Sequence, residues 1–477
     1  MAVTKDNGAL NAQNKAGSSE PGTPGPGEKT EHRGSFFGWD LHGNGRDIEP
    51  GGVVKPEERL SWPRTIGVGM QHVIAMFGAT LLVPTITGFP VNTTLLFSGL
   101  GTILFLLVTR NRLPSYLGSS FAFLAPLAAT QAEGFAAQLG GIVATGALLF
   151  VIGLVVQLAG RQVLDAVMPP AVTGAIVALI GLNLAPTSTG NVQEQPLIAG
   201  VTLLGILLFT VMGRGMVARL GILLGVLTGW GFAFLSGGVS EGARQHVGEA
   251  AWIGFPHFET PEFTVTAVTI TLPVVVVLIA ENVGHVKAVS TMTNRNLDDL
   301  AGKALMADGM STVLAGSGGG SGTTTYAENI GVMAATKVYS TAAYWVAACF
   351  AIVLAFIPKF GAIIFTIPVG VLGGACLVLY GLIGMLGIRI WQDNRVDFTD
   401  PVNLTAAAVA LIVGIGNLTL QAGPVALEGI ALGSVGVIIV YPLMRWCYNT
   451  VGEGRYRLGF PTKKREPANV ADPHTFG

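Results

Sequence analysis

The chain has 477 residues, of which 50% are hydrophobic and only 12% are charged, and its formal net charge is −1. A soluble domain carries about 25% charged residues, so this composition excludes an ordinary soluble protein and predicts an all-α membrane protein with many spans. The nearly neutral charge gives no indication of a nucleic-acid partner.

Both ends of the chain have a different composition from the middle. Residues 1–62 are rich in Gly, Pro, Ser and charged residues, and they predict a disordered tail because they contain too little apolar surface to offset the entropy of ordering. Residues 452–477 predict a second disordered tail for the same reason. A membrane domain is therefore expected over residues 63–451.

Fourteen apolar segments follow one another between the tails, and most have the roughly 20 residues that a bilayer-spanning helix needs. They are expected at residues 65–87, 92–109, 117–130, 137–160, 165–186, 196–213, 219–237, 266–289, 303–317, 323–336, 339–358, 362–390, 401–420 and 424–447. The third and the tenth segments have only 14 residues each. Short segments at corresponding positions of two halves indicate the binding site of a transporter.

The positive charges support this topology. If the N-terminus lies in the cytoplasm and the segments alternate in direction, 25 of the 27 lysines and arginines fall on the cytoplasmic side. Such a bias is typical of membrane proteins. It predicts a multi-pass protein of the inner or plasma membrane with both termini in the cytoplasm.

An internal repeat accounts for the two short segments. "MPPAVTGAIVALIGLNLA" from Met168 is similar to "IPVGVLGGACLVLYGLIG" from Ile367, and the two short segments are separated by nearly the same interval of about 200 residues. A half of seven segments is odd, so the second copy enters the membrane upside down. This predicts two inverted seven-segment repeats, with a site near the midplane where the copies meet.

Within the third segment, "YLGSSFAFLAP" offers Ser119 and Phe121. Phe121 has two possible roles. It is either an apolar side chain that faces the lipid or, next to a second broken segment, a surface on which a planar ring can stack.

The eighth segment contains Glu281 and His285 four residues apart, so the two side chains share one helix face. Ionisable residues inside membrane segments are costly and indicate function. This pair is expected to carry a proton and to bind a polar solute; the alternative is an ion pair that only fixes helix packing. In the ninth segment, Asp308 is a possible network partner, and His72 in the first is expected to serve helix packing.

The tenth segment begins after the glycine-rich run "GSGGGSGTTT", which cannot form a stable helix, and it contains Tyr326, Ala327, Glu328 and Asn329. A chain break here would expose backbone N–H groups at a helix N-terminus to a polar ligand. There is no phosphate-loop motif and no zinc motif in this region, so neither a metal nor a cofactor is expected. Carboxylates that accept N–H groups and amides that donate to carbonyls suit a small heterocycle such as uracil.

Several motifs resemble those of the nucleobase–ascorbate transporters. The signature of that family is Gln, Glu or Pro, then Asn, any residue, Gly, four further residues, Thr, and Arg, Lys or Gly; "ENIGVMAATK" from Glu328 to Lys337 agrees at every defined position. "QHVIAMFGATLLVP", "LPSYLGSSFAF" and "AENVGH" also resemble the bacterial uracil:proton symporters of this family. The chain differs by having Ala327 where a close uracil permease has Gly and Gly322 where Pro is common.

The resemblance implies a core domain of segments 1–4 and 8–11 (residues 65–160 and 266–358), a gate domain of segments 5–7 and 12–14 (residues 165–237 and 362–447), and a homodimer. It also implies a strand followed by a half-helix in segments 3 and 10. Substrate binding is expected from residues of segments 3, 8 and 10, with His285 and Glu281 in proton coupling; the binding residues are Ser119, Phe121, Glu281, Tyr326, Ala327 and Glu328.

The expected function is therefore import of uracil with a proton by alternating access, and not enzymatic catalysis. A xanthine or other purine symporter of the same family is the alternative.

Overall fold

The structure is a computed structural model that describes residues 37–49, 51–160, 169–422, 425–427 and 429–457. Contacts divide the chain into Met1–Gly38 and Trp39–Gly477, and all elements named below belong to the second unit. Parts of the two predicted tails, residues 1–36 of 1–62 and residues 458–477 of 452–477, lie outside the described residues, as does the start of the fifth segment at residues 165–168.

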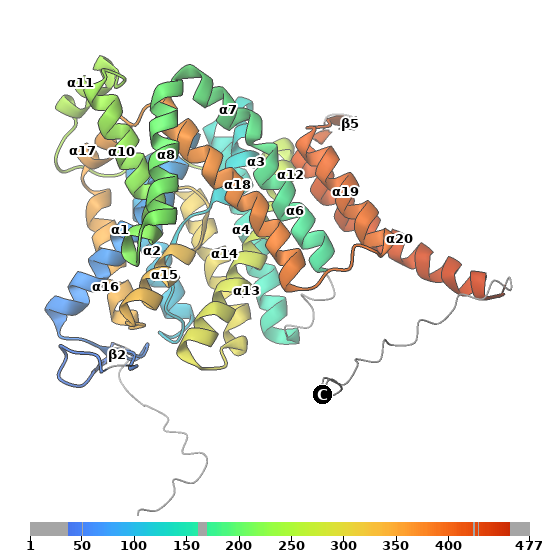
Figure 1. Cartoon of the computed structure of the whole chain (residues 1–477), viewed down its shortest axis with the longest axis horizontal. Helices are drawn as coiled ribbons and strands as arrows, with labels where there is room; N and C mark the ends of the chain where they lie inside the picture. The colour runs from blue at the N-terminus through green and yellow to red at the C-terminus, as the bar shows by residue number, and fades with distance from the viewer. Residues whose placement is uncertain (1–36, 50, 161–168, 423–424, 428, 458–477) are drawn as a thin grey trace, which may run out of the picture. The chain divides into compact units, whose positions relative to one another are not determined.

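The described part is mostly helical, as the composition predicts (Figure 1). The helices at the predicted segments are α1 (Trp62–Thr87), α2 (Val91–Val108), α3 (Leu124–Ala129), α4 (Phe135–Ala159), α6 (Pro170–Asn183), α8 (Pro196–Met212), α10 (Gly221–Leu235), α12 (Val265–Thr271), α13 (Val274–Thr293), α14 (Ala301–Ser317), α15 (Ala327–Thr336), α16 (Thr341–Ala355), α17 (Pro358–Ile364), α18 (Val369–Asp393), α19 (Pro401–Ile415) and α20 (Gly429–Arg457).

Shorter elements connect them: the 3-10 turns η1 (Phe121–Phe123), η2 (Gln131–Glu133) and η3 (Asp298–Leu300), and the helices α7 (Ala185–Glu194), α9 (Met216–Arg219) and α11 (Glu241–Glu249). The strands form three pairs: β1 (Asp40–Leu41) with β2 (Glu58–Arg59), β3 (Leu117–Ser119) with β4 (Thr323–Thr325), and β5 (Leu420–Ala422) with β6 (Val425–Leu427).

Within the described ranges, six helical stretches are long and apolar enough to cross a membrane, or seven if the bent pair α16 and α17 forms one span. Helices α8, α10 and α19 are also apolar but shorter than 18 residues. These findings support a multi-pass membrane protein. The total of fourteen segments stays a prediction.

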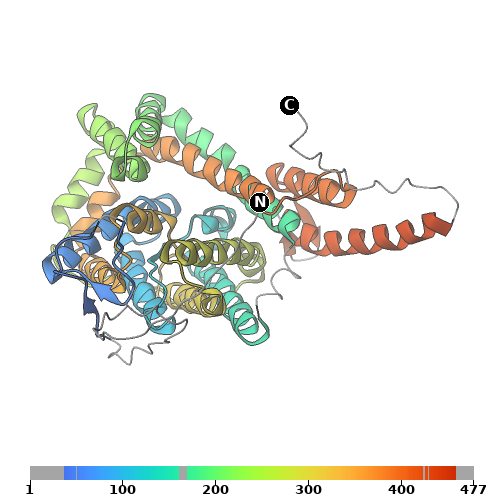
Figure 2. The same ribbon diagram turned by 60° about the horizontal axis from the view of Figure 1, so that its bottom comes forward.

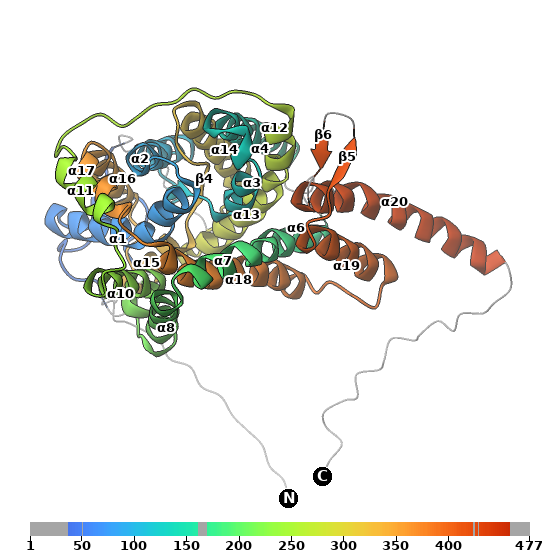
Figure 3. The ribbon, with the colours of Figure 1, turned by 90° about the horizontal axis from the view of Figure 1, so that it is seen from above.

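Two groups of helices can be distinguished by their contacts. Helix α14 packs against α4 and α2, and α16 packs against α2 and α1. Separately, α18 packs against α6, α7 and α8, while α19 packs against α6 and α20. Figure 2 and Figure 3 show α6, α7, α8, α10 and α18 side by side, next to the first group.

The repeat motif begins α6 and α18, which pack directly on each other. A Cβ added to Gly181 would lie 2.4 Å from the backbone nitrogen of Gly384, and one added to Gly174 would lie 2.8 Å from the carbonyl oxygen of Gly387. Glycine is therefore required at both positions because the two backbones touch.

Two boundaries of the predicted tails were wrong. Residues 39–49 and 51–61 are folded: Val54 and Leu60 are buried in a small cluster with Val68, Val338 and Ala343. The average composition of the tail hides these two apolar residues, which suffice because the backbone around them is hydrogen-bonded. At the other end, α20 continues through Arg457, past the expected boundary at residue 451.

Candidate functional site

The site is built on two short strands from distant parts of the chain. Strand β3 pairs antiparallel with β4, with Gly118 opposite Thr324 and Ser119 opposite Thr323. Two further backbone hydrogen bonds extend the pair, from Ser120 N to Gly322 O (2.9 Å) and from Tyr326 N to Tyr116 O (3.0 Å). The third and tenth segments are therefore joined to each other.

Each strand leads directly into a helix, so each segment contains the expected strand and short helix. Strand β3 continues into η1 and α3, while β4 continues into α15, which begins at Ala327. Because the strands are antiparallel, the two helices start at opposite ends of the pair and run in opposite directions. The first N–H groups of a helix have no partner within it, so α15 can donate hydrogen bonds to a ligand.

Five of the predicted site residues are partly or fully exposed, although their neighbours in the chain are mostly buried. They are Phe121 of η1, Glu281 and His285 of α13, and Ala327 and Glu328 of α15. Helix α13 contacts β4, α15 and η1. The structure thus brings these five residues from three segments to one region around the strand pair.

Polar side chains of β4 are hydrogen-bonded to the two predicted site residues of α13. The hydroxyl of Thr324 donates to Oε2 of Glu281 (3.0 Å). At the next residue of β4, the hydroxyl of Thr325 is hydrogen-bonded to Nδ1 of His285 (2.6 Å). Neither threonine was predicted as a site residue, although the run of three threonines in an apolar chain was a visible signal.

A buried chain of hydrogen bonds continues from these threonines to Asp308 of α14. Thr325 donates to Oδ1 of Asn282 (3.4 Å), and Nδ2 of Asn282 donates to Oδ2 of Asp308 (2.6 Å). The hydroxyl of Thr323 donates to the other carboxyl oxygen of Asp308 (3.3 Å). Asp308 is therefore the network partner that the ninth segment suggested, and Asn282 is a member that sequence reasoning missed.

The carboxyl groups of this region have no cationic partner. Among the described residues, no lysine, arginine or histidine lies within salt-bridge distance of Glu281, Glu328 or Asp308. Glu281 and Glu328 lie close enough for their charges to interact. Unpaired carboxylates are costly in a low-dielectric interior, so binding of N–H donors or of a proton would relieve the repulsion.

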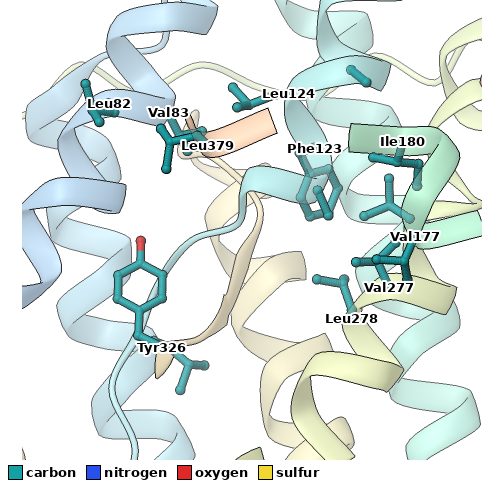
Figure 4. Packing of buried hydrophobic residues seen from close by; sticks show 14 of the residues in the cluster. Leu82, Val83, Phe123, Leu124, Val177, Ile180, Val277, Leu278, Tyr326 and Leu379 are labelled. Carbon is teal, nitrogen blue, oxygen red and sulfur yellow. The ribbon is translucent and has the colours of Figure 1, made fainter. Parts of the chain in front are cut away.

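Two further predicted binding residues are buried at the strand pair. Tyr326 and Ser119 are only 3% and 1% exposed. The Tyr326 hydroxyl donates to the carbonyl oxygen of Ser119 (2.8 Å) and is hydrogen-bonded to Thr80 of α1 (2.9 Å). Figure 4 shows Tyr326 among the buried side chains of the core, with Phe123 on the side of Val177 and Ile180. We therefore assign Tyr326 and Ser119 to the scaffold of the strand pair.

Asn329, the second residue of the signature, joins α15 to α1. Its Nδ2 lies 3.1 Å from Nδ1 of His72 and donates to the backbone oxygen of His72 (3.0 Å). The ring of His72 is 4.3 Å from the ring of Tyr344. His72 is thus a buried packing residue, as expected.

Gly118 is the point of closest approach between β3 and its surroundings. A Cβ at this position would lie 2.5 Å from the Thr80 hydroxyl and 2.6 Å from the Tyr326 ring. We expect Gly118→Val to destabilise the protein by about 1–3 kcal/mol, because the side chains of Thr80 and Tyr326 must move to admit the new side chain. The melting temperature of the purified protein measures this loss. Gly190→Val in α7 is the control, since nothing lies within 4 Å of its added Cβ; equal melting temperatures for the two variants would contradict the prediction.

With this geometry described, comparison with known proteins identifies the family. The family model Xan_ur_permease, described as a permease family, matches residues 63–423. The chain belongs to this family, the nucleobase:cation symporter-2 permeases.

Curated relatives agree with this family. The chain is 47% identical over 409 residues to "Putative pyrimidine permease RutG" of Escherichia coli (strain K12), covering 82% of this chain and 92% of the relative. It is 38% identical over 408 residues to "Uracil permease" of the same strain, covering 82% and 94%. A "Uracil permease" of Paenibacillus larvae is 36% identical over 405 residues, covering 81% and 96%.

Solved structures show the same fold at low sequence identity. The murine Slc26a9 anion transporter in an inward-facing state has a TM-score of 0.58 at 12% identity, with 83% of this chain and 70% of that chain covered. The transmembrane domain of the cyanobacterium bicarbonate transporter BicA has a TM-score of 0.50 at 13% identity, with 79% and 96% covered. These likenesses place the permease among membrane transporter folds.

Proposed function

We propose that this permease imports uracil together with a proton across the inner or plasma membrane. One observation carries the proposal: Glu281 and Glu328, two carboxyl groups with no cationic partner in the described part of the chain, are partly exposed beside a strand pair that ends in a helix N-terminus. The relatives named uracil permease support this choice of base.

The base would lie between the two broken segments. Uracil presents two N–H donors, which Glu281 and Glu328 would accept, and two carbonyls, which backbone N–H groups at Phe121 and Ala327 would hydrogen-bond. The ring of Phe121 would stack on the base. Ala327 adds one methyl group at the start of α15, on the exposed side, and so would influence which bases fit.

Proton coupling would use the hydrogen-bonded network behind the site. His285 is linked through Thr325 and Asn282 to Asp308, while Glu281 is linked to Thr324. The contacts of His285, Glu281 and Asn282 with Thr324 and Thr325 meet on β4, and α15, which follows β4 in the chain, carries Glu328. A proton taken up by this network would reduce the repulsion among the carboxylates and thereby favour substrate binding.

The transport cycle would be alternating access. We infer fourteen segments in two inverted repeats, with α1–α4 and α12–α16 in a core domain and α6–α10 and α17–α20 in a gate domain. The core domain would move against the gate domain and release both ligands to the cytoplasm, where both termini would lie. A homodimer is the proposed assembly.

A purine symporter is the second candidate, because the family also includes carriers of xanthine. Position 328 is the first residue of the family signature. Glutamate at this position resembles the uracil carriers of the family, whereas its purine carriers usually have glutamine there, so Glu328 favours uracil. The anion transporters of similar fold are a weaker guide to substrate, because two unpaired carboxylates would repel an anion.

Uptake into proteoliposomes tests the proposal. With an imposed inward proton gradient, labelled uracil should accumulate and should be recovered chemically unchanged, and unlabelled uracil should compete better than xanthine. Stronger competition by xanthine would overturn the choice of base. Accumulation that persists with a proton uncoupler would contradict proton symport, and recovery of altered substrate would indicate an enzyme.

A further inference from the structure

The folded segment at residues 39–49 and 51–61, here called the strap, is attached to the ends of the two helices that carry the site carboxylates. We propose that the strap is a positioning element that ties the C-terminal end of α13 to the C-terminal end of α15 and so sets the spacing of Glu281 and Glu328. The inference rests on the proposed function for the role of these carboxylates; the attachment itself rests on the contacts below.

The first attachment is to the end of α15. Lys337 ends this helix in the left-handed conformation (φ 59°), and its carbonyl oxygen accepts a hydrogen bond from Val54 N (2.9 Å). Tyr339 N then donates to Val54 O (2.8 Å), and Thr341 N donates to Pro56 O (3.0 Å). The strap thus pairs with the chain as a strand would, directly after the last residue of the family signature.

Apolar and aromatic contacts strengthen this attachment. Val54 is fully buried in the cluster with Val338 and Ala343, on either side of the turn between α15 and α16. Trp39 donates from Nε1 to the hydroxyl of Thr341 (2.8 Å). Burial of the apolar Val54 side chain stabilises this contact.

The second attachment is to the end of α13. The helix ends at Asn294, also in the left-handed conformation, and Arg295 N returns to the carbonyl oxygen of Ser290 (3.1 Å). The Arg295 guanidinium then donates two hydrogen bonds to Glu57 of the strap (2.5 and 2.8 Å). A bidentate pair of this kind fixes direction as well as distance.

The Glu57–Arg295 pair is ionised at neutral pH. Partial burial alone would raise the pKa of Glu57, but the hydrogen bonds and the charge of Arg295 outweigh it, so the pKa lies below its ordinary value. The two side chains are 37% and 39% exposed, so the pair adds little to stability and its main effect is geometric.

Helices α13 and α15 contact each other, and each also has other neighbours: α13 packs against β4, α4, α6 and α14, and α15 packs against α1. From Glu281 to the end of α13 the helix extends about 18 Å. The strap adds a direct link between the C-terminal ends of the two helices. Such a tie restricts how far these ends can move apart, and we expect it to hold the carboxylates in the geometry of the bound base.

The test compares Glu57→Gln and Arg295→Gln with the exchanged double variant Glu57→Arg plus Arg295→Glu in the full chain. We expect each single variant to bind uracil about 3- to 10-fold more weakly at 25 °C while still folded, and the exchange to restore most of the affinity. Arg112→Gln is the matched control. It breaks the ion pair between Arg112 and Asp299 (2.9 Å), and Asp299 lies in the same connection between α13 and α14 as Arg295, but neither residue belongs to the strap. Wild-type affinity in both single variants, or an equal loss in Arg112→Gln, would overturn the proposal.

A second readout does not depend on the ligand. The three native cysteines, Cys349, Cys376 and Cys447, are first replaced. Spin labels are then attached at two exposed positions, Lys287 of α13 and Ala335 of α15, and report the distance between the two helices. We expect Glu57→Gln to broaden the distance distribution and Arg112→Gln to leave it unchanged. An unchanged distribution in Glu57→Gln would overturn the strap proposal. If the wild-type protein fails to bind uracil, the proposed function is wrong, and the label distances alone decide the role of the strap.

Discussion

Glu328→Gln should weaken uracil binding by about 10- to 150-fold while the protein still inserts and folds. The carboxylate of Glu328 lies in the first turn of α15, partly exposed and without a cationic partner, where it can accept an N–H group of the base. A hydrogen bond to a charged group contributes about 1.5–3 kcal/mol, and glutamine would replace that acceptor with a neutral amide. Calorimetric titration of the purified variant with uracil measures the effect.

The matched control for this substitution is Glu133→Gln. Glu133 is exposed on η2, which follows α3 in the chain and precedes α4. Its affinity for uracil should equal that of the wild type, and size-exclusion profiles should be the same for all three proteins. Wild-type affinity in Glu328→Gln would refute the site assignment.

His285→Ala should reduce proton-driven accumulation of uracil at least about tenfold, with only a small loss of equilibrium binding. His285 is hydrogen-bonded through Thr325 and Asn282 to Asp308, so its removal interrupts the network that would carry the proton. Proton transfer by a positioned side chain contributes about 10²–10⁴-fold in enzymes, and a tenfold loss is a cautious lower figure for a transporter. Uptake under a pH gradient and uracil binding in detergent are measured on the same preparation.

His246→Ala provides the comparison, because His246 is exposed on α11 and far from β4 in the chain. Uracil exchange between loaded proteoliposomes, which needs no net proton movement, should continue in His285→Ala. If accumulation and binding fall by the same factor, His285 acts in binding and the coupling assignment is wrong.

The sequence by itself determined the class of protein and the place of most segments. Each apolar stretch is long and continuous, so the helices α1, α2, α4 and α14 could be placed to within a few residues. The sequence placed Glu281 and His285 on one helix face because they are four residues apart. The signature from Glu328 to Lys337 identified the family. All of these features are local along the chain, which is why they could be predicted.

The tertiary structure decided what lies next to these residues. The register of β3 on β4 joins residues about 200 positions apart, and it turns Thr324 toward Glu281 and Thr325 toward His285. It also buries Tyr326 and Ser119, which sequence reasoning placed against the substrate. The strap escaped prediction because composition averages over the whole tail, whereas its folding depends on a few residues such as Val54 and Glu57 that meet partners from α13 and the turn after α15. Side-chain direction and partner choice depend on which distant strand or helix arrives, and that information is absent from any local stretch of sequence.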